Sequence, residues 1–276
     1  MTAGFPIKPD PSGRRRMEQG SHAESFMCWT CGSCDAECPV NIRTNRLRPQ
    51  KLVRMAYLGL LDELVCDPEI WYCLGCRCCS SVCPNRVKPV QVAAYARREA
   101  VRQGIVRRSV REGCRDACTR LQYDRAEAAF KFMDGLPSDF TRRLPPFQTR
   151  DKDRLARGSP ANAFLCFNCS ECGSACPIFV SRRIFDPQLI IRMVQFDMIS
   201  KLLKSPMIWL CLGCGSCTSA CPQKVDACGI IRWLQKTAVA QKAVDPDFTS
   251  RFKAAEQSIY HRFVANVDAV LGFQAD

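Results

Sequence analysis

Four cysteine runs of the form C-x2-C-x2-C-x3-C-P are the residues of this chain whose type and spacing could do chemistry. They read CWTCGSCDAECP, CLGCRCCSSVCP, CFNCSECGSACP and CLGCGSCTSACP. Three thiolates on one tight loop can bind three irons of a cubane, and this spacing is typical of two-cluster bacterial ferredoxins. The runs therefore predict four [4Fe-4S] clusters. The alternative is four zinc sites, which usually use pairs of C-x2-C instead.

The runs belong to an internal duplication. Residues 28–97 align without a gap to residues 166–235, at a constant offset of 138. Each of the eight motif cysteines in the first copy has a cysteine partner in the second, and a proline follows the last cysteine of each run. The chain thus holds two copies of a unit with two cluster motifs.

The segments between the motifs predict helices. Thirty-four residues separate Cys38 from Cys73, and the same number separate Cys176 from Cys211. From Pro49 onward the apolar residues fall on one broad helical stripe: Leu52, Val53, Ala56, Leu60, Leu61 and Leu64. The equivalent stripe after an Asp186-Pro187 cap contains Ile190, Ile191, Val194, Met198 and Leu202. Residues 88–104 and 226–242, after the second motifs, also read as helices, so we expect an all-α fold.

This pattern predicts five parts. Two tandem α-helical dicluster domains occupy residues 25–103 and 161–242. Residues 1–24 form a flexible N-terminal extension, residues 104–160 a basic helical connector and loop, and residues 243–276 a C-terminal helical extension. In this extension Phe252, Ile259, Phe263 and Val267 recur at helical spacing. The connector and the last helix either clasp the two copies together or dock a partner.

Five of the 21 cysteines lie outside the repeat: Cys66, Cys78, Cys114, Cys118 and Cys228. Cys66 aligns with Lys204 and Cys78 with Ser216, so we interpret both as non-ligands. Cys114 and Cys118 stand four apart on a predicted helix and could meet as a dithiol or metal pair, although an inert pair is the simpler interpretation. The role of Cys228 stays open.

The charge balance first suggests an anionic partner. The chain has 40 Lys and Arg against 27 Asp and Glu, a formal net charge of +13. Four oxidised cubanes on sixteen thiolates would contribute about −2 each and lower this to about +5. No apolar segment follows Arg14-Arg15-Arg16, and no apolar run approaches the length of a membrane span. We therefore expect a cytoplasmic protein without a transmembrane segment, which reaches a membrane only through a partner.

Other catalytic motifs are missing. The sequence has no dinucleotide-binding glycine fingerprint, no P-loop and no nucleophile elbow. A chain that holds clusters but no substrate-binding motif can transfer electrons, but it needs one partner as electron donor and another as electron acceptor. The sequence thus predicts an electron relay with no catalytic residues, and leaves open whether the chain is itself an enzyme.

The two runs, joined by a spacer that ends in PEIWYCLGC or PMIWLCLGC, resemble the HdrC subunit of heterodisulfide reductase and the α-helical ferredoxin family around it. The resemblance covers residues 25–103 and 161–242, and the fusion of two copies departs from it. It implies an electron-transfer subunit of a hetero-oligomeric complex in anaerobic energy metabolism. The partners it implies are an HdrA-like flavoprotein and an HdrB-like catalytic subunit.

The resemblance also implies the cluster ligands. Each cluster would take three leading cysteines of one motif and the last cysteine of the other. The first copy would use Cys28, Cys31, Cys34 and Cys83 for one cluster and Cys73, Cys76, Cys79 and Cys38 for the next. The second copy would use Cys166, Cys169, Cys172 and Cys221, then Cys211, Cys214, Cys217 and Cys176.

Similar modules occur in the iron-sulfur subunits of glycolate oxidase and anaerobic glycerol-3-phosphate dehydrogenase, beside a Cys-Cys-Gly motif. Here Ser80 follows Cys78-Cys79, so no non-cubane site is assigned. Two other functions stay open, a self-sufficient reductase and a nucleic-acid-binding protein with structural clusters. All sixteen repeat cysteines are present and no cluster lacks a ligand, which argues against open-site catalysis by a reductase. We also expect no nucleic-acid partner.

Overall fold

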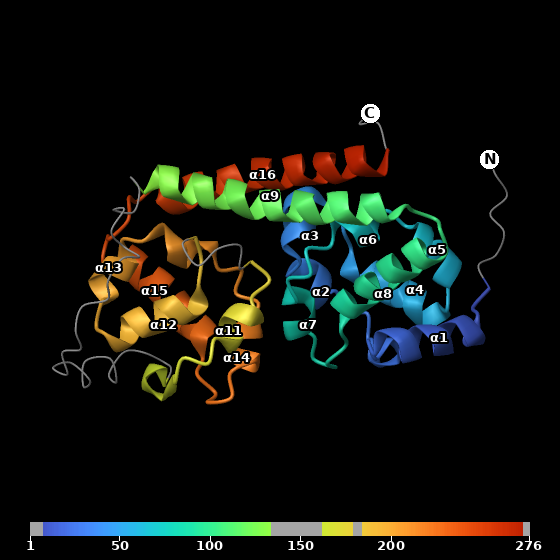
Figure 1. Cartoon of the computed structure of the whole chain (residues 1–276), viewed down its shortest axis with the longest axis horizontal. Helices are drawn as coiled ribbons and strands as arrows, with labels where there is room; N and C mark the ends of the chain where they lie inside the picture. The colour runs from blue at the N-terminus through green and yellow to red at the C-terminus, as the bar shows by residue number, and fades with distance from the viewer. Residues whose placement is uncertain (1–7, 134–161, 179–183, 273–276) are drawn as a thin grey trace. The chain divides into compact units, whose positions relative to one another are not determined.

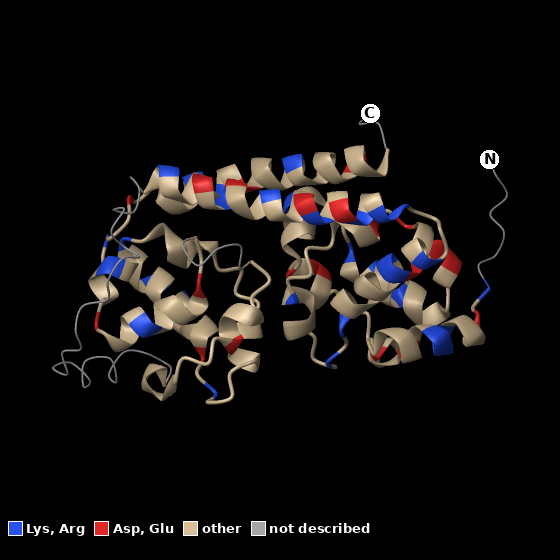
Figure 2. Cartoon of the chain, in the orientation of Figure 1, with Lys and Arg blue, Asp and Glu red and all other residues tan. Residues whose placement is uncertain are grey.

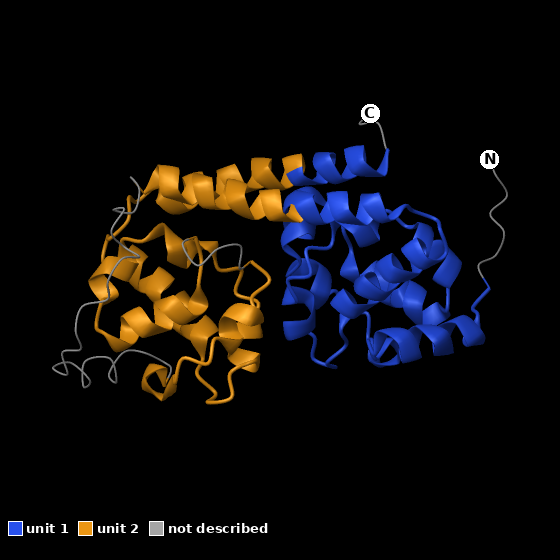
Figure 3. Ribbon diagram, in the orientation of Figure 1, with its two compact units in different colours: residues 1–117, 263–276 blue, residues 118–262 orange. Residues whose placement is uncertain are grey.

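The computed structural model describes residues 8–133, 162–178 and 184–272. Every regular element within these residues is a helix, so the all-α prediction is confirmed. The chain divides into two compact units, Met1–Ala117 with Phe263–Asp276 (unit 1) and Cys118–Arg262 (unit 2), coloured blue and orange in Figure 3. None of the described helices is long and apolar enough to cross a bilayer.

Apart from α3 (Pro39–Thr44), each element of the first copy has an equivalent among the described residues of the second copy (Figure 1). Those of the first copy are η1 (Ser25–Met27), α2 (Ser33–Ala36), α3 (Pro39–Thr44), α4 (Pro49–Leu58), α5 (Leu61–Cys66), α6 (Glu69–Tyr72), α7 (Cys78–Ser81) and α8 (Pro89–Arg102). Those of the second, within its described residues, are η2 (Ala163–Leu165), α11 (Glu171–Ser174), α12 (Pro187–Gln195), α13 (Ile199–Leu203), η3 (Pro206–Leu210), α14 (Ser216–Ser219) and α15 (Ala227–Ala240). The duplication seen in the sequence is therefore a duplication of structure.

The spacer helices form for the reasons that the sequence suggests. Proline opens α4, α8 and α12, where its missing N–H is not needed. The Asp186 carboxylate accepts a hydrogen bond from Gln188 N at 2.9 Å and caps α12. Leu52, Val53 and Ala56 on α4 are almost completely buried. Their apolar stripe is what holds the spacer against the rest of unit 1.

One long helix was expected from Pro49, but the structure has two. Helix α4 ends at Gly59, whose φ of +76° is a left-handed conformation, and α5 begins at Leu61. The Gly59 N–H donates to Ala56 O and Leu60 N donates to Met55 O, a pairing that closes the helix end. The break turns the chain back toward the second motif.

The expectation of a flexible extension over residues 1–24 is wrong for the part that the structure describes. Helix α1 (Pro11–Ser21) is capped by Asp10 and packs on α4 and α8. Met17 is completely buried, and Asp10 N donates to Leu58 O at 2.9 Å. The sequence did not predict this helix, because the segment is polar and buries only one large apolar side chain.

Gly59 should be essential for this docking. A Cβ at Gly59 would lie 1.8 Å from Asp10 O, in addition to the strain of its positive φ. We expect Gly59→Ala to lower the unfolding free energy by about 2 kcal/mol or more, because the backbone of α1 must move. The matched control is Gly104→Ala, where φ is +73° but no atom lies within 4 Å; it should cost about 1 kcal/mol. Equal melting temperatures for the two variants would contradict this account.

Two long helices complete the described chain, α9 (Arg108–Phe132) and α16 (Phe248–Leu271), and each contributes residues to both units. Both were expected as helices, and Phe252, Ile259, Phe263 and Val267 of α16 are buried. Basic and acidic residues alternate along α9 (Figure 2). The loop predicted after α9 lies outside the described residues, and the domain boundaries given above stay predictions.

Candidate iron-sulfur sites

All four cysteine runs adopt the same loop conformation. In each, the second and the fourth residue after the first cysteine have a positive φ. These residues are Thr30 and Gly32, Gly75 and Arg77, Asn168 and Ser170, and Gly213 and Gly215. Loops with such left-handed residues can direct successive N–H groups into a concave site, a form that binds anions at many iron-sulfur sites. The four loops are therefore shaped alike although their residues differ.

Backbone N–H groups reach the cysteine sulfurs in these loops. Thr30 N donates to Cys28 Sγ at 3.4 Å, and Gly75 N and Gly213 N donate to Cys73 Sγ and Cys211 Sγ at 3.5 and 3.4 Å. Val225 N donates to Cys221 Sγ at 3.3 Å. Such bonds stabilise thiolates and raise the potential of a bound cluster.

Three cavities bring together cysteines from two motifs. The Cys38 cavity is lined by Cys38 of the first motif and by Cys73, Cys76 and Cys79 of the second. The Cys28 cavity is lined by Cys28, Cys31, Cys34 and Cys83. In unit 2 the Cys176 cavity is lined by Cys176, Cys211, Cys214, Cys217 and, in addition, Cys228. In each cavity the last cysteine of one motif faces the three leading cysteines of the other.

Of the fourth expected set, Cys166 and Cys169 lie close enough to Cys172 to raise its pKa further, although burial is the main cause of the rise to about 11. Cys166 and Cys172 also pack against the buried core of unit 2, as does Cys221.

Apart from their thiols the cavities are mostly apolar, although Arg77 lines the Cys38 cavity and Gln50 and Asn85 line the Cys28 cavity. Burial raises the pKa of Cys38 and of Cys217 to about 12, and the nearby thiols Cys73 and Cys214 add to this. Burial also raises the pKa of Cys73, against the opposing charge of Arg97. The Arg97 guanidinium donates to Ile70 O and to Cys73 O, so a positive charge is fixed next to this motif.

The five cysteines outside the repeat separate into two kinds. Cys66 is exposed, Cys118 is half-buried, and Cys78 and Cys114 are buried; none of these four lines a described cysteine cavity. Cys228, however, lies in the Cys176 cavity. Sequence reasoning missed this thiol because its partner in the first copy is Val90, so the repeat gave no signal for it.

The donor sets fit [4Fe-4S] clusters. Each of the three cavities offers four thiols from a wrapped loop and a distant cysteine, with N–H groups directed at the sulfurs and an apolar lining that limits water. Among the described residues, no three His, Cys, Asp or Glu side chains are arranged around a single-ion position.

Two family models match the chain, and both describe a 4Fe-4S dicluster domain. One matches residues 27–88 and the other residues 162–225. Each match lies almost entirely within one copy of the repeat and includes all eight of that copy's motif cysteines. Together they give the chain two dicluster domains in tandem.

Several curated relatives are parts of heterodisulfide reductases. The HdrC subunit of the H(2):CoB-CoM heterodisulfide,ferredoxin reductase of Methanothermobacter thermautotrophicus is 40% identical over 79 residues, which are 29% of this chain and 42% of that protein. The HdrC-like protein of Archaeoglobus profundus is 40% identical over 77 residues, 28% of this chain and 41% of that protein.

A more distant relative is the probable glycolate oxidase iron-sulfur subunit of Bacillus subtilis, 31% identical over 91 residues, which are 30% of this chain and 20% of that protein. The chain thus spans less than half the length of these relatives. It contains two tandem 4Fe-4S dicluster domains and is similar in sequence to the HdrC subunits of heterodisulfide reductases.

Proposed function

We propose that the chain is the iron-sulfur electron-transfer subunit of a heterodisulfide-reductase-like complex. It would relay electrons through its clusters between an HdrA-like flavoprotein and an HdrB-like or other acceptor subunit. The observation that carries the proposal is the grouping of four cysteines from two motifs around each of three cavities. The names of the relatives support the type of complex.

The proposal includes the cluster ligands. The sets would be Cys28, Cys31, Cys34 and Cys83; Cys73, Cys76, Cys79 and Cys38; Cys166, Cys169, Cys172 and Cys221; and Cys211, Cys214, Cys217 and Cys176. A bound cluster supplies one-electron redox chemistry at each site. The protein's own groups would hold the cluster by thiolates, exclude water with apolar side chains and direct N–H groups at the sulfurs. No disulfide joins the described cysteines, which supports a reducing compartment such as the cytoplasm.

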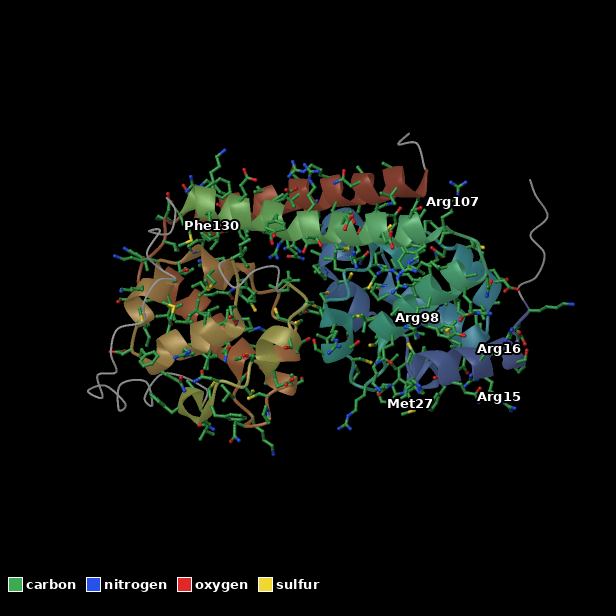
Figure 4. The ribbon with its side chains drawn as sticks, in the orientation of Figure 1. Arg15, Arg16, Met27, Arg98, Arg107 and Phe130 are labelled. Carbon is green, nitrogen blue, oxygen red and sulfur yellow. The ribbon has the colours of Figure 1, made fainter. Side chains whose placement is uncertain are left out.

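Exposed apolar side chains surround the first motif of each copy and support contact with a redox partner. Trp29, between two cysteines of the Cys28 cavity, is 74% exposed, and Phe26 and Met27 are about half exposed. Met27 is labelled at the surface of unit 1 in Figure 4. The equivalent residues of the second copy are also exposed: Phe164, Leu165 and Phe167. Large exposed apolar side chains grouped in this way mark protein-protein contacts.

Electron transfer to a partner tests the function. The loaded chain should co-purify with a flavoprotein and take electrons from it. Trp29→Ala should slow this transfer about tenfold or more at limiting partner concentration, because interface tryptophans commonly contribute about 2 kcal/mol or more. The cluster content should stay unchanged. Ile105→Ala is the control, since Ile105 is exposed but lies outside the motifs. A reductase activity of the isolated chain at the rate of a complex, or an unaffected Trp29→Ala variant, would count against the proposal.

The two copies should differ in reduction potential. Arg77 lines the Cys38 cavity, and Gly215 occupies the equivalent position of the Cys176 cavity. A guanidinium stabilises the more negative, reduced cluster, so Arg77→Gly should lower one potential, on the order of tens of millivolts. Arg77→Lys, which keeps the charge at the same positive φ, should change it little. An EPR-monitored redox titration compares the three proteins. Identical potentials for wild type and Arg77→Gly would refute this effect of charge.

A further inference from the structure

The Cys176 cavity contains one thiol more than a cubane needs. Besides Cys176, Cys211, Cys214 and Cys217, it is lined by Cys228. Cys228 is 5% exposed and lies in the first turn of α15. Cys211, one of the proposed ligands, lies beside it in the same cavity lining. The fifth sulfur therefore lies among the four proposed ligands.

The backbone around Cys228 is fixed. Asp226 accepts a hydrogen bond from Gly229 N at 2.9 Å and caps α15. Cys228 N donates to Thr218 Oγ1 at 3.1 Å, and this hydroxyl donates to Asp226 Oδ1 at 2.8 Å. These bonds join the start of α15 to α14, the helix that contains Cys217. Cys228 thus keeps its place in the cavity through the same elements that place the ligands.

The surroundings of the Cys228 sulfur resemble those of a ligand sulfur. Gly215 lines the cavity with Cys228, and two residues earlier in the same loop Gly213 N donates to Cys211 Sγ at 3.4 Å. Arg232, one turn later on α15, donates to Gly213 O at 2.6 Å and brings a positive charge to the same loop. A sulfur that binds iron needs such N–H and cationic neighbours because it carries negative charge.

The first copy offers an internal comparison. Val90 is the residue equivalent to Cys228 and lines the Cys38 cavity in the same way, beside Cys73, Cys76 and Cys79. The position therefore faces the cavity in both copies, but only the second copy has a sulfur there.

We propose that Cys228 is a spare ligand for the cluster of the Cys176 cavity, able to take the iron that Cys211 binds. This inference rests on the ligand sets of the proposed function. In the exchange the Cys228 sulfur bonds to iron and loses its proton, while the Cys211 sulfur leaves the iron and takes up one proton. No electron is transferred and the total charge is unchanged. One cluster of the four therefore has two alternative coordination sets.

The test compares equivalent cysteines of the two copies in the full chain, prepared anaerobically. Wild type should contain about 16 iron atoms per chain, as four cubanes require. Cys211→Ala should retain about 16, because Cys228 replaces the lost ligand, whereas Cys73→Ala should fall to about 12. The double variant Cys211→Ala with Cys228→Val should also fall to about 12.

The outcomes are distinct. If Cys211→Ala loses as much iron as Cys73→Ala, the spare ligand is refuted while the ligand sets stand. If Cys73→Ala keeps all its iron, the ligand sets themselves are wrong. Should Cys211→Ala not be recovered folded, the first copy answers the question. Val90→Cys should restore the cluster to Cys73→Ala, and failure to restore it would overturn the proposal.

Discussion

Replacing Arg125 with methionine should destabilise unit 2 more than any other single substitution outside the cysteines. Arg125, on α9, is 2% exposed and forms an ion pair at 2.8 Å with Glu256 of α16, which is 8% exposed. It also donates to Gln122 Oε1 at 3.0 Å and to Leu210 O at 3.2 Å. Removing one partner leaves a buried carboxylate without a counter-charge, which costs about 3–5 kcal/mol.

The loss should also reach the cluster site, because Leu210 directly precedes Cys211. Thermal unfolding and iron content of the loaded protein measure both effects. Arg262→Ala is the matched control, since Arg262 pairs with Asp124 at 3.1 Å between the same two helices but is 57% exposed. Such an exposed pair contributes about 1 kcal/mol or less. The double variant Arg125→Met with Glu256→Leu should recover much of the stability, because it leaves no unpaired charge. An Arg125→Met variant as stable as Arg262→Ala would contradict the prediction.

Removing the clusters should have the second large effect. Thr30, Arg77, Asn168 and Ser170 hold a positive φ in the cluster loops, a conformation that costs a non-glycine residue on the order of 1 kcal/mol or more. A bound cluster stabilises these loops, and binding free energy at a site absent from the unfolded chain adds to folding free energy. Treatment with an oxidant and a chelator should therefore remove much of the cooperative melting transition and part of the helical circular dichroism signal.

Chelator without oxidant is the control for this experiment, since intact cubanes should resist it. Iron and sulfide added back under reducing conditions should restore the transition. An identical melting curve before and after complete loss of iron would show that the loops fold without their clusters.

The duplication and the helical class were predictable because their signals are local and repeated. Each signal depends on one short segment alone. The signals are the cysteine spacing, the prolines that open α4 and α12, and the apolar stripe through Ile190. The shared spacing of the four runs also predicted loops of one shape. Positive φ values could be expected from the sequence only at the glycines Gly32, Gly75, Gly213 and Gly215. Thr30, Asn168 and Ser170 adopt them as well.

What the sequence could not predict depends on contacts between distant segments. Helix α1 is polar, and only the close approach of Asp10 to Gly59 explains why it docks. Cys228 stands outside both motifs, and its place in a cavity depends on how α15 meets the Cys211 loop. Arg125 looks like one more charge on a basic helix until its burial against Glu256 is known. None of these three features could be predicted, because composition and spacing do not show which distant residues are in contact in the fold.

The central claim is that each cluster takes the last cysteine of the other motif in its unit. Iron content of two double variants of the first unit, prepared anaerobically, tests it most directly. Cys38→Ala with Cys76→Ala removes two ligands of one proposed set and should leave about 12 iron atoms per chain. Cys38→Ala with Cys31→Ala removes ligands of two sets and should leave about 8. The reverse result, about 8 for the first pair and about 12 for the second, would show that each run binds its own cluster and would contradict the account.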